Sequence, residues 1–233
     1  ATNEIYTLSL HDALPILIIV YTELNCLSSE CEKQNLPFFL DRHGMDSAII
    51  SEIKKHKEVL MQLETFALTV LPAAAKLLIG CLEQGGCIYI CGNGGSAADS
   101  QHIAAELVGR FRRERRGLPA VALTTDTSIL TSVGNDYGFE QVFSRQMEGL
   151  AAPGDVLWAF STSGTSKNVI AAVKTARAKG AKILAFTGKS NTPLEQMSDV
   201  CIALNGPTST VQEIHQLAYH ILCDLVEEHF TEK

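Results

Sequence analysis

The sequence lacks the marks of several common classes of protein. Positive charge is not in excess: 19 Lys and Arg stand against 26 Asp and Glu, and the formal net charge is −7. Long-range electrostatics therefore give no general reason to bind nucleic acid. A Gly-x-x-x-x-Gly-Lys-Ser/Thr motif is also missing, which disfavours a P-loop nucleotide hydrolase. The 233 residues, 46% hydrophobic and 19% charged, are enough for one α/β domain with its own core.

One local exception to the negative balance is a run of arginines, made up of Arg110, Arg112, Arg113, Arg115 and Arg116. Such a run is typical of a basic patch for an anionic ligand, and equally of a solvated loop. The sequence leaves both interpretations open.

Paired cysteine motifs are missing as well. The chain has seven cysteines, an odd number, and no Cys-x-x-Cys pair, so neither a disulfide framework nor a thiolate zinc site is expected. Those from residue 81 onward lie in apolar strand or helix patterns: Cys81, Cys87, Cys91, Cys201 and Cys223. We predict small buried thiols in a reducing compartment, and hence a cytoplasmic protein.

The first 42 residues lack the regular helix and strand patterns of the rest of the chain. Their apolar run, residues 14–20, is too short to span a bilayer, and no basic region precedes it, so we expect neither a membrane segment nor a signal peptide. Residues 5–16 resemble a translated sequencing adapter. We predict that residues 1–42 are a non-native or disordered extension, and that residues 43–233 form a single domain.

That domain is expected to open with a helical hairpin. Apolar residues recur at helical spacing after a possible Asp46 cap; they are Ile49, Ile53, Leu60 and Leu63. A second helix is predicted from about Pro72, which suits a first turn, to Gly85 and Gly86.

Strands and helices then alternate to the end of the chain. Apolar strands are predicted at residues 87–90, 120–123, 156–160, 182–186 and 200–204, and helices at 96–109, 167–178 and 209–230. Continuous apolar strands between helices indicate a parallel sheet covered on both faces. The predicted fold is therefore α/β, a doubly wound, five-stranded parallel sheet of the flavodoxin-like or Rossmann-like kind. Ligands of such sheets bind at the carboxyl ends of the strands, where the strand order reverses.

Two loops at this edge are suited to phosphate. The first, Cys91 to Ser96, is rich in glycine and opens a helix, so backbone N–H groups can approach an anion. It also loosely fits a dinucleotide fingerprint, with Asp126 available after the second strand, and a tight turn alone could require its glycines. The second loop, Ser161 to Ser166, carries five hydroxyl side chains before the next helix. Helix caps and turns could also use these serines, but two such loops suit a small sugar phosphate better than a dinucleotide.

Acid–base residues lie on two of the predicted helices. His102 and Glu106 are four residues apart and share one helix face, while Gln212 and His220 are eight residues apart on the last helix. Nitrogen and oxygen ligands without thiolate can hold zinc or a similar divalent ion. A lone His-x-x-x-Glu pair is more often an ordinary hydrogen bond, and spacing does not decide between the two.

Several motifs together resemble the phosphoheptose isomerases of the SIS (sugar isomerase) family over residues 47–230. In chain order they are Cys91–Ser96, Gln101–Leu107, Gly134–Phe139, Ser161–Ser166 and Gln212–His215 with His220. The resemblance implies conversion of sedoheptulose 7-phosphate to D-glycero-D-manno-heptose 7-phosphate in a bacterial cytoplasm, for lipopolysaccharide or a similar glycan. It also implies a homotetramer with shared active sites, and neither nucleic acid nor membrane as a partner.

The resemblance also implies roles for single residues. Glu106 would be the general base and His220 its acid partner. One Zn²⁺ per active site would be held by His102, Glu106, Gln212 and His220. The phosphate would be held by Ser161, Thr162, Ser163 and Ser166, and the rest of the sugar by Asn93, Gly94, Gly95, Ser96, Asn135, Asp136 and Gln212. The loop Asn205 to Thr210 lacks the charged residues of some enterobacterial relatives, which leaves substrate detail open.

Other functions stay open at this point. A non-catalytic SIS protein, such as the relative that associates with the replication initiator, would keep the phosphate loop but depart at the catalytic residues. Here both Glu106 and His220 are present. A sugar-phosphate sensor or an isomerase of another sugar phosphate fits the same loops. A dinucleotide oxidoreductase is disfavoured, because it has no use for the hydroxyl-rich second loop.

Overall fold

The structure, a computed structural model, describes residues 42–231. The chain divides into two compact units, Ala1–Ile50 and Ser51–Lys233. Of the first unit only residues 42–50 are described, and they are helical. The prediction of an extension over residues 1–42 therefore lies almost wholly outside the described residues.

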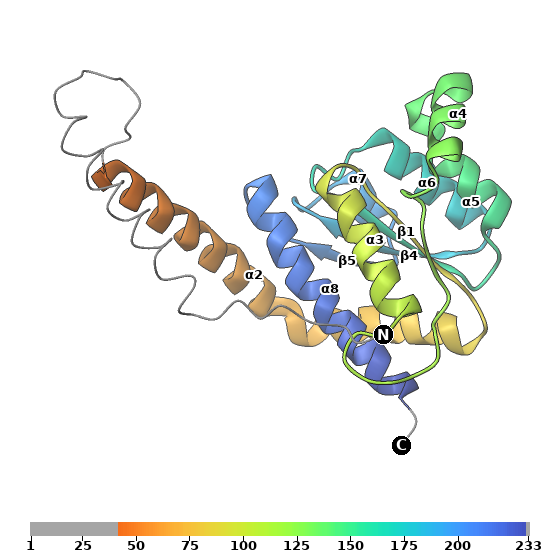
Figure 1. Cartoon of the computed structure of the whole chain (residues 1–233), viewed down its shortest axis with the longest axis horizontal. Coiled ribbons are helices and arrows are strands. Elements are labelled where there is room, and N and C mark those ends of the chain that lie inside the picture. Colours follow the sequence, from red (N-terminus) through yellow and green to blue (C-terminus); the bar gives the residue numbers. More distant parts are fainter. Residues whose placement is uncertain (1–41, 232–233) are drawn as a thin grey trace, which may run out of the picture. The chain divides into compact units, whose positions relative to one another are not determined.

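The second unit contains one five-stranded sheet in which every pair of neighbouring strands is parallel (Figure 1). Its strands are β1 (Ile88–Cys91), β2 (Ala120–Ala122), β3 (Val156–Ser161), β4 (Lys182–Thr187) and β5 (Val200–Ala203). Their order is β2-β1-β3-β4-β5, which is the flavodoxin-like order and confirms the predicted fold class. The register pairs Ile90 with Trp158, and Trp158 with Leu184. The strand order reverses between β1 and β3.

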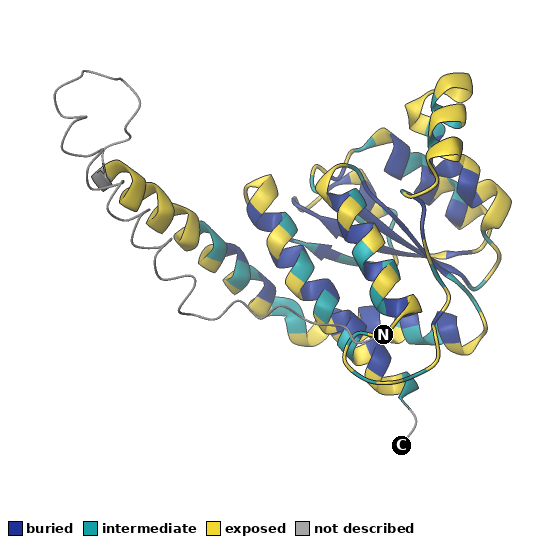
Figure 2. Cartoon of the chain, in the orientation of Figure 1, coloured by how far each residue is buried: buried dark blue, intermediate teal, exposed yellow. Residues whose placement is uncertain are grey.

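Helices cover both faces of this sheet. They are α2 (Arg42–Glu83), α3 (Gly95–Val108), α4 (Thr127–Tyr137), α5 (Ser144–Leu150), α6 (Lys167–Ala178), α7 (Pro193–Gln196) and α8 (Thr208–Phe230), with a 3₁₀ turn η1 (Phe139–Gln141). Alternate strand residues feed two separate cores, because successive side chains of a strand point to opposite faces. Ile90 and Trp158 pack with residues of α2, α3 and α8. Leu157 and Ile183 pack with residues of α5 and α6. Figure 2 shows the buried residues along the strands and on the inward sides of these helices.

The expected helical hairpin is instead one helix. α2 continues through Pro72, and Asp46 lies inside it rather than at its cap. Proline removes one hydrogen bond of the helix, which favours an end there. Packing outweighs this loss, because Leu71, Ala75 and Leu78 on both sides of Pro72 are buried in the core. No residues form a turn between the two expected helices.

Helix α2 also has the length and composition of a membrane-crossing helix over Gly44–Glu83, the only such segment among residues 42–231. One third of its most apolar window, 33%, is buried inside the fold. Core helices of soluble proteins meet the same criterion, so the feature is weak evidence for a membrane.

The cysteines behave as predicted within the described residues. Cys81, Cys91 and Cys223 are buried, Cys87 and Cys201 are partly buried, and all five are free thiols. Burial raises the pKa of Cys91 to about 12, so this thiol stays protonated and unreactive at neutral pH.

Candidate active site

The two phosphate-compatible loops lie side by side at the switch point of the sheet. They leave the carboxyl ends of β1 and β3, which are neighbouring strands. A pair of reciprocal hydrogen bonds joins the first loop to the start of helix α6, which follows the second: the Asn93 amide donates to Asn168 Oδ1 at 2.9 Å, and the Asn168 amide donates to Asn93 Oδ1 at 2.8 Å. Gly94 has φ +56°, a left-handed conformation that favours glycine. Asn168 was not predicted from the sequence, because only the fold brings it beside Asn93.

The second loop gathers its hydroxyl groups at the start of helix α6. Ser161 Oγ lies 2.8 Å from Ser166 Oγ and 3.3 Å from Ser163 Oγ. Gly164 between them has φ +68°, and a Cβ there would overlap the side chain of Thr192. Because α6 begins at Lys167 directly after these hydroxyls, its first N–H groups and the positive end of its dipole face the same place. This arrangement suits a phosphate monoester.

The acid–base residues of α3 and α8 form one cluster. His102 Nε2 lies 3.0 Å from Glu106 Oε1, and His220 Nε2 lies 3.5 Å from His102 Nε2. One ligand atom of each residue lies within 4.8 Å of the other two, and all three residues are partly buried. A carboxylate and two imidazoles at this separation can exchange protons with a bound molecule or hold a cation.

Two buried residues, Tyr219 and Asp99, form a chain of polar contacts with His102. The Tyr219 hydroxyl lies 3.0 Å from His102 Nδ1 and donates to Asp99 Oδ1 at 3.5 Å. With its proton on Asp99, the hydroxyl accepts from an N–H at His102 Nδ1, and His102 Nε2 then bonds to the Glu106 carboxylate either through a proton of its own or through a cation held between them. Asp99 and Tyr219 belong to none of the motifs seen in the sequence, although each lies within three residues of a predicted site residue.

The environment keeps His220 uncharged near neutral pH. Burial lowers the pKa of His220 below the ordinary histidine value, and the nearby His102 and Arg112 act in the same direction. Glu106 opposes this shift without reversing it. A neutral imidazole can accept a proton or bind a metal ion. The ring of Phe111 lies on His220, with 5.3 Å between ring centroids and 15° between planes.

Gln212 is linked to this cluster through Asp99. Its amide donates to Asp99 Oδ1 at 3.4 Å, and its side chain covers Gly95 so closely that a Cβ at residue 95 would overlap it. Among the described residues Gln212 makes no hydrogen bond to His102 or His220. Ser96 is buried at the start of α3 and accepts from Ser100 through its carbonyl oxygen.

Asn135 and Asp136 are exposed on α4 and bond to each other at 2.8 Å. Within residues 42–231 they make no hydrogen bond to another predicted site residue. Thr162 is partly buried, and its carbonyl oxygen accepts from Gly188. The fold therefore places the two loops on neighbouring strands and joins His102, Glu106 and His220 in one cluster, while Asn135 and Asp136 are bonded to each other.

The family model of the SIS domain matches residues 53–188 of this chain. Fold, loops and match together define a SIS-domain protein. Among curated relatives, a phosphoheptose isomerase of Aliarcobacter butzleri is 45% identical over 188 residues, which is 80% of this chain and 100% of that protein.

Solved structures of phosphoheptose isomerases also match this chain. The phosphoheptose isomerase of Neisseria gonorrhoeae matches with a TM-score of 0.74 and 41% identity, covering 79% of this chain and 99% of that one. That of Francisella tularensis matches with a TM-score of 0.75 and 35% identity, over 78% and 97%. The chain belongs to the phosphoheptose isomerase family.

Proposed function

We propose that this chain is an aldose–ketose isomerase that converts sedoheptulose 7-phosphate to D-glycero-D-manno-heptose 7-phosphate. The observation that carries the proposal is the cluster of His102, Glu106 and His220, in a chain that also has two phosphate-compatible loops on neighbouring strands and is 45% identical to a phosphoheptose isomerase over that protein's whole length. The product would supply heptose for lipopolysaccharide or a similar surface glycan of a bacterium, and the reaction would take place in the cytoplasm.

The reaction moves a carbonyl group from C2 to C1 and needs two proton transfers. Glu106 takes a proton from C1, the C2 carbonyl becomes part of a cis-enediol, and the same carboxyl group returns the proton to C2. His220 moves the remaining proton from O1 to O2, which its neutral imidazole can do because it both accepts and donates. Each proton removed is returned, so the sugar is neither oxidised nor reduced overall. A well-placed acid or base of this kind typically contributes about 10²–10⁴-fold in rate.

The two loops would hold the substrate while this happens. Ser161, Ser163 and Ser166, with Thr162, would donate hydrogen bonds to the phosphate, together with the first N–H groups of α6. Asn93, Gly94 and Gly95, with Ser96, would line the sugar chain. The Asn93–Asn168 pair would keep the two loops at a fixed separation, which sets the distance between phosphate and reacting carbons.

The cluster also fits a divalent ion. Two imidazole nitrogens and a carboxylate oxygen suit Zn²⁺, and Tyr219, which contacts His102 Nδ1, would leave the Nε2 lone pair of His102 available to the ion. We propose one Zn²⁺ per active site, held by His102, Glu106 and His220; a fourth ligand, Gln212, rests on the family resemblance alone. When bound, such an ion supplies Lewis-acid polarisation of the sugar oxygens.

Assembly would complete the site. We propose a homotetramer with shared active sites, on the basis of the family resemblance. Asn135 and Asp136 are exposed, so their expected contacts with the sugar would be made in the site of a neighbouring copy. We propose no nucleic-acid or membrane partner.

The test is aldose formation from sedoheptulose 7-phosphate by the purified protein, before and after chelation and with zinc restored. Glu106→Gln should abolish turnover and leave sugar-phosphate binding intact, because the phosphate loop is untouched. Glu114→Gln is the matched control, since that carboxylate is 87% exposed and its one ion pair within residues 42–231 is with the exposed Arg110. Near-native turnover in Glu106→Gln would contradict the assignment. Binding without turnover in the native protein would favour a sugar-phosphate sensor instead.

A further inference from the structure

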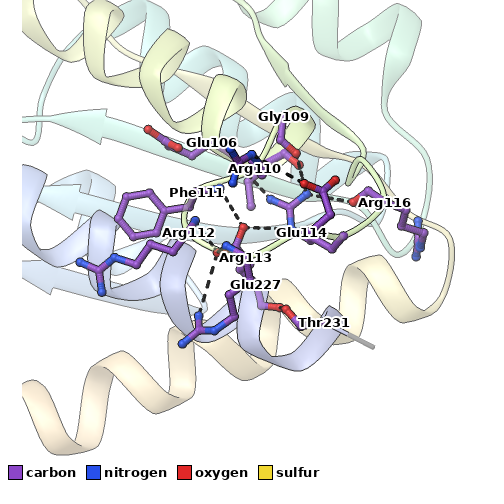
Figure 3. Close-up of polar contacts among 12 residues, drawn as sticks. Glu106, Gly109, Arg110, Phe111, Arg112, Arg113, Glu114, Arg116, Glu227 and Thr231 are labelled. Atoms are coloured by element: carbon purple, nitrogen blue, oxygen red, sulfur yellow. Dashed lines mark hydrogen bonds and ion pairs between the residues drawn. The ribbon is translucent and has the colours of Figure 1, made fainter. Parts of the chain in front are cut away.

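The carboxylate of Glu227 on α8 accepts hydrogen bonds from the backbone of the loop that follows α3 (Figure 3). Glu227 Oε1 accepts from the N–H of Phe111 at 2.8 Å. Oε2 accepts from the N–H groups of Arg112 at 2.7 Å and Arg113 at 2.8 Å. The Glu227 side chain is fully buried. Three consecutive N–H groups turned toward one buried carboxylate fix the course of this loop, because a buried carboxylate that lost these donors would be costly.

Arg115 completes this arrangement from the loop side. Its side chain is 1% exposed and lies 3.5 Å from Glu227. It donates to four backbone carbonyl groups at 2.7–3.0 Å, those of Glu106, Leu107, Gly109 and Arg116. Two of these carbonyls belong to the last turn of α3, where no intrahelical donor remains. We call Glu227 and Arg115, with the N–H and C=O groups they bind, the loop clamp.

The loop held in this way carries Phe111, and Phe111 lies on the imidazole of His220. The rings are stacked, with 5.3 Å between centroids and 15° between planes. His220 also lies within 3.5 Å of His102, so its ring has little freedom to turn without breaking one of these contacts. Residues 109–117 contain no helix or strand, and the position of Phe111 therefore depends on the clamp.

We propose that Glu227 is a positioning residue, which acts through the loop clamp to hold Phe111 against His220 and so fixes the orientation of the His220 ring toward the substrate. The inference rests on the proposed isomerase function. It also explains the arginine run: Arg115 is structural and buried, while Arg112 and Arg113 bond through their side chains to Asp224. The run is neither a free basic patch nor a wholly solvated loop.

The kinetic test compares Glu227→Gln, Phe111→Leu and Phe111→Tyr with the native protein on sedoheptulose 7-phosphate. Glu227→Gln and Phe111→Leu should lower kcat about tenfold or more, since misplacing a catalytic group by about 1 Å can lower the rate some 10²-fold. KM should change less than about twofold, because the phosphate loop is untouched. Phe111→Tyr keeps the stacked ring and should keep kcat near native.

Asp224→Asn is the matched control. Asp224 lies three residues before Glu227 on the same helix and bonds to the side chains of Arg112 and Arg113, but to none of the loop N–H groups. It makes the same acid-to-amide change without opening the clamp, and kcat should stay near native. An equal loss of kcat in Asp224→Asn would overturn the proposal, because the arginine side chains and not the clamped backbone would then be responsible.

A second readout does not depend on turnover. In protein labelled with ¹³C at the histidine rings, the His220 resonance is identified by its absence in His220→Gln among the seven histidines. The stacked Phe111 ring shields His220, so Phe111→Leu and Glu227→Gln should both move that resonance downfield, and Asp224→Asn should not. An unmoved resonance in Glu227→Gln, or native kcat in Phe111→Leu, would overturn the proposal. A native protein without turnover would contradict the proposed function, and the resonances would still decide whether the clamp exists.

Discussion

Tyr219 links the candidate active-site residue His102 to a buried carboxylate. Its hydroxyl lies between the carboxylate of Asp99 and the Nδ1 atom of His102. Asp99 is buried, and its Oδ2 atom has no hydrogen-bond partner within residues 42–231. Burial raises the pKa of Asp99, while the bonds from Gln212 and Tyr219 lower it. The chain of three residues therefore sets which nitrogen of His102 carries the proton.

Tyr219→Phe should test this chain. The ring stays and the hydroxyl is lost, so His102 can take either tautomer and Asp99 loses a donor. We expect kcat to fall about 10- to 100-fold, the usual range for an orienting partner of a ligating histidine. Zinc affinity measured by competition with a chelator should fall with it. Unchanged values for both would show that the hydroxyl does not orient His102.

His215 is a second residue whose environment has a measurable consequence. It is buried beneath β4, where its Nε2–H donates to the Thr187 carbonyl at 3.2 Å. Burial lowers the pKa of His215 from 6.5 to about 4. Between about pH 4 and pH 6.5, His215 is therefore uncharged in the folded protein but protonated in the unfolded chain.

Stability should fall as the pH drops from about 6.5 to about 4, because only the unfolded state gains the proton in that window. The full effect of His215 is roughly 3 kcal/mol. Denaturant unfolding at a series of pH values should show this slope in the native protein and a smaller one in His215→Gln. Parallel curves for the two proteins would contradict the assignment.

At the scale of the element, the βα loop after β3 depends on one glycine. Gly164 combines φ +68° with a close approach to Thr192. The loop and the segment before α7 are thereby packed together, and Leu194 N–H donates to the Gly164 carbonyl at 3.2 Å.

Gly164→Ala should displace this loop and raise KM for the sugar phosphate, with a loss of stability of roughly 1–3 kcal/mol from the strained backbone. Gly85→Ala is the control. Its φ is +79°, but no atom lies within 4 Å of the added Cβ, so it should reduce stability without changing KM. Equal effects on KM in both variants would show that the loop is not the phosphate site.

The elements themselves were largely predictable, for a physical reason. Buried parallel strands read as continuous apolar runs, and all five were found within one or two residues of their ends. The continuity of α2 through Pro72 was not predictable, because core packing rather than local preference decides it. Helices α4 and α5 were missed as well. The local signal for α4 is Asp126, which caps that helix by accepting from the Ile129 N–H at 2.9 Å.

At the scale of the whole molecule, the predicted site separates into parts that sequence motifs reveal and parts that only the fold assembles. The two loops and the His102–Glu106 pair are short-range patterns, and the structure places the loops on neighbouring strands and the pair on one face of α3. The contact between Glu227 and Phe111 joins residues 116 positions apart, and no local pattern indicates it. The same holds for Asn93 and Asn168, which are 75 positions apart.

The two halves of this site are carried by different parts of the architecture. In the proposed function, loops at the ends of β1 and β3 would receive the phosphate, and side chains of α3 and α8 would supply the acid–base groups. A few substitutions on the two helices could remove the chemistry while the loops, the sheet and the core stay as they are. A sugar-phosphate sensor could thus evolve from such an enzyme and keep the same binding site.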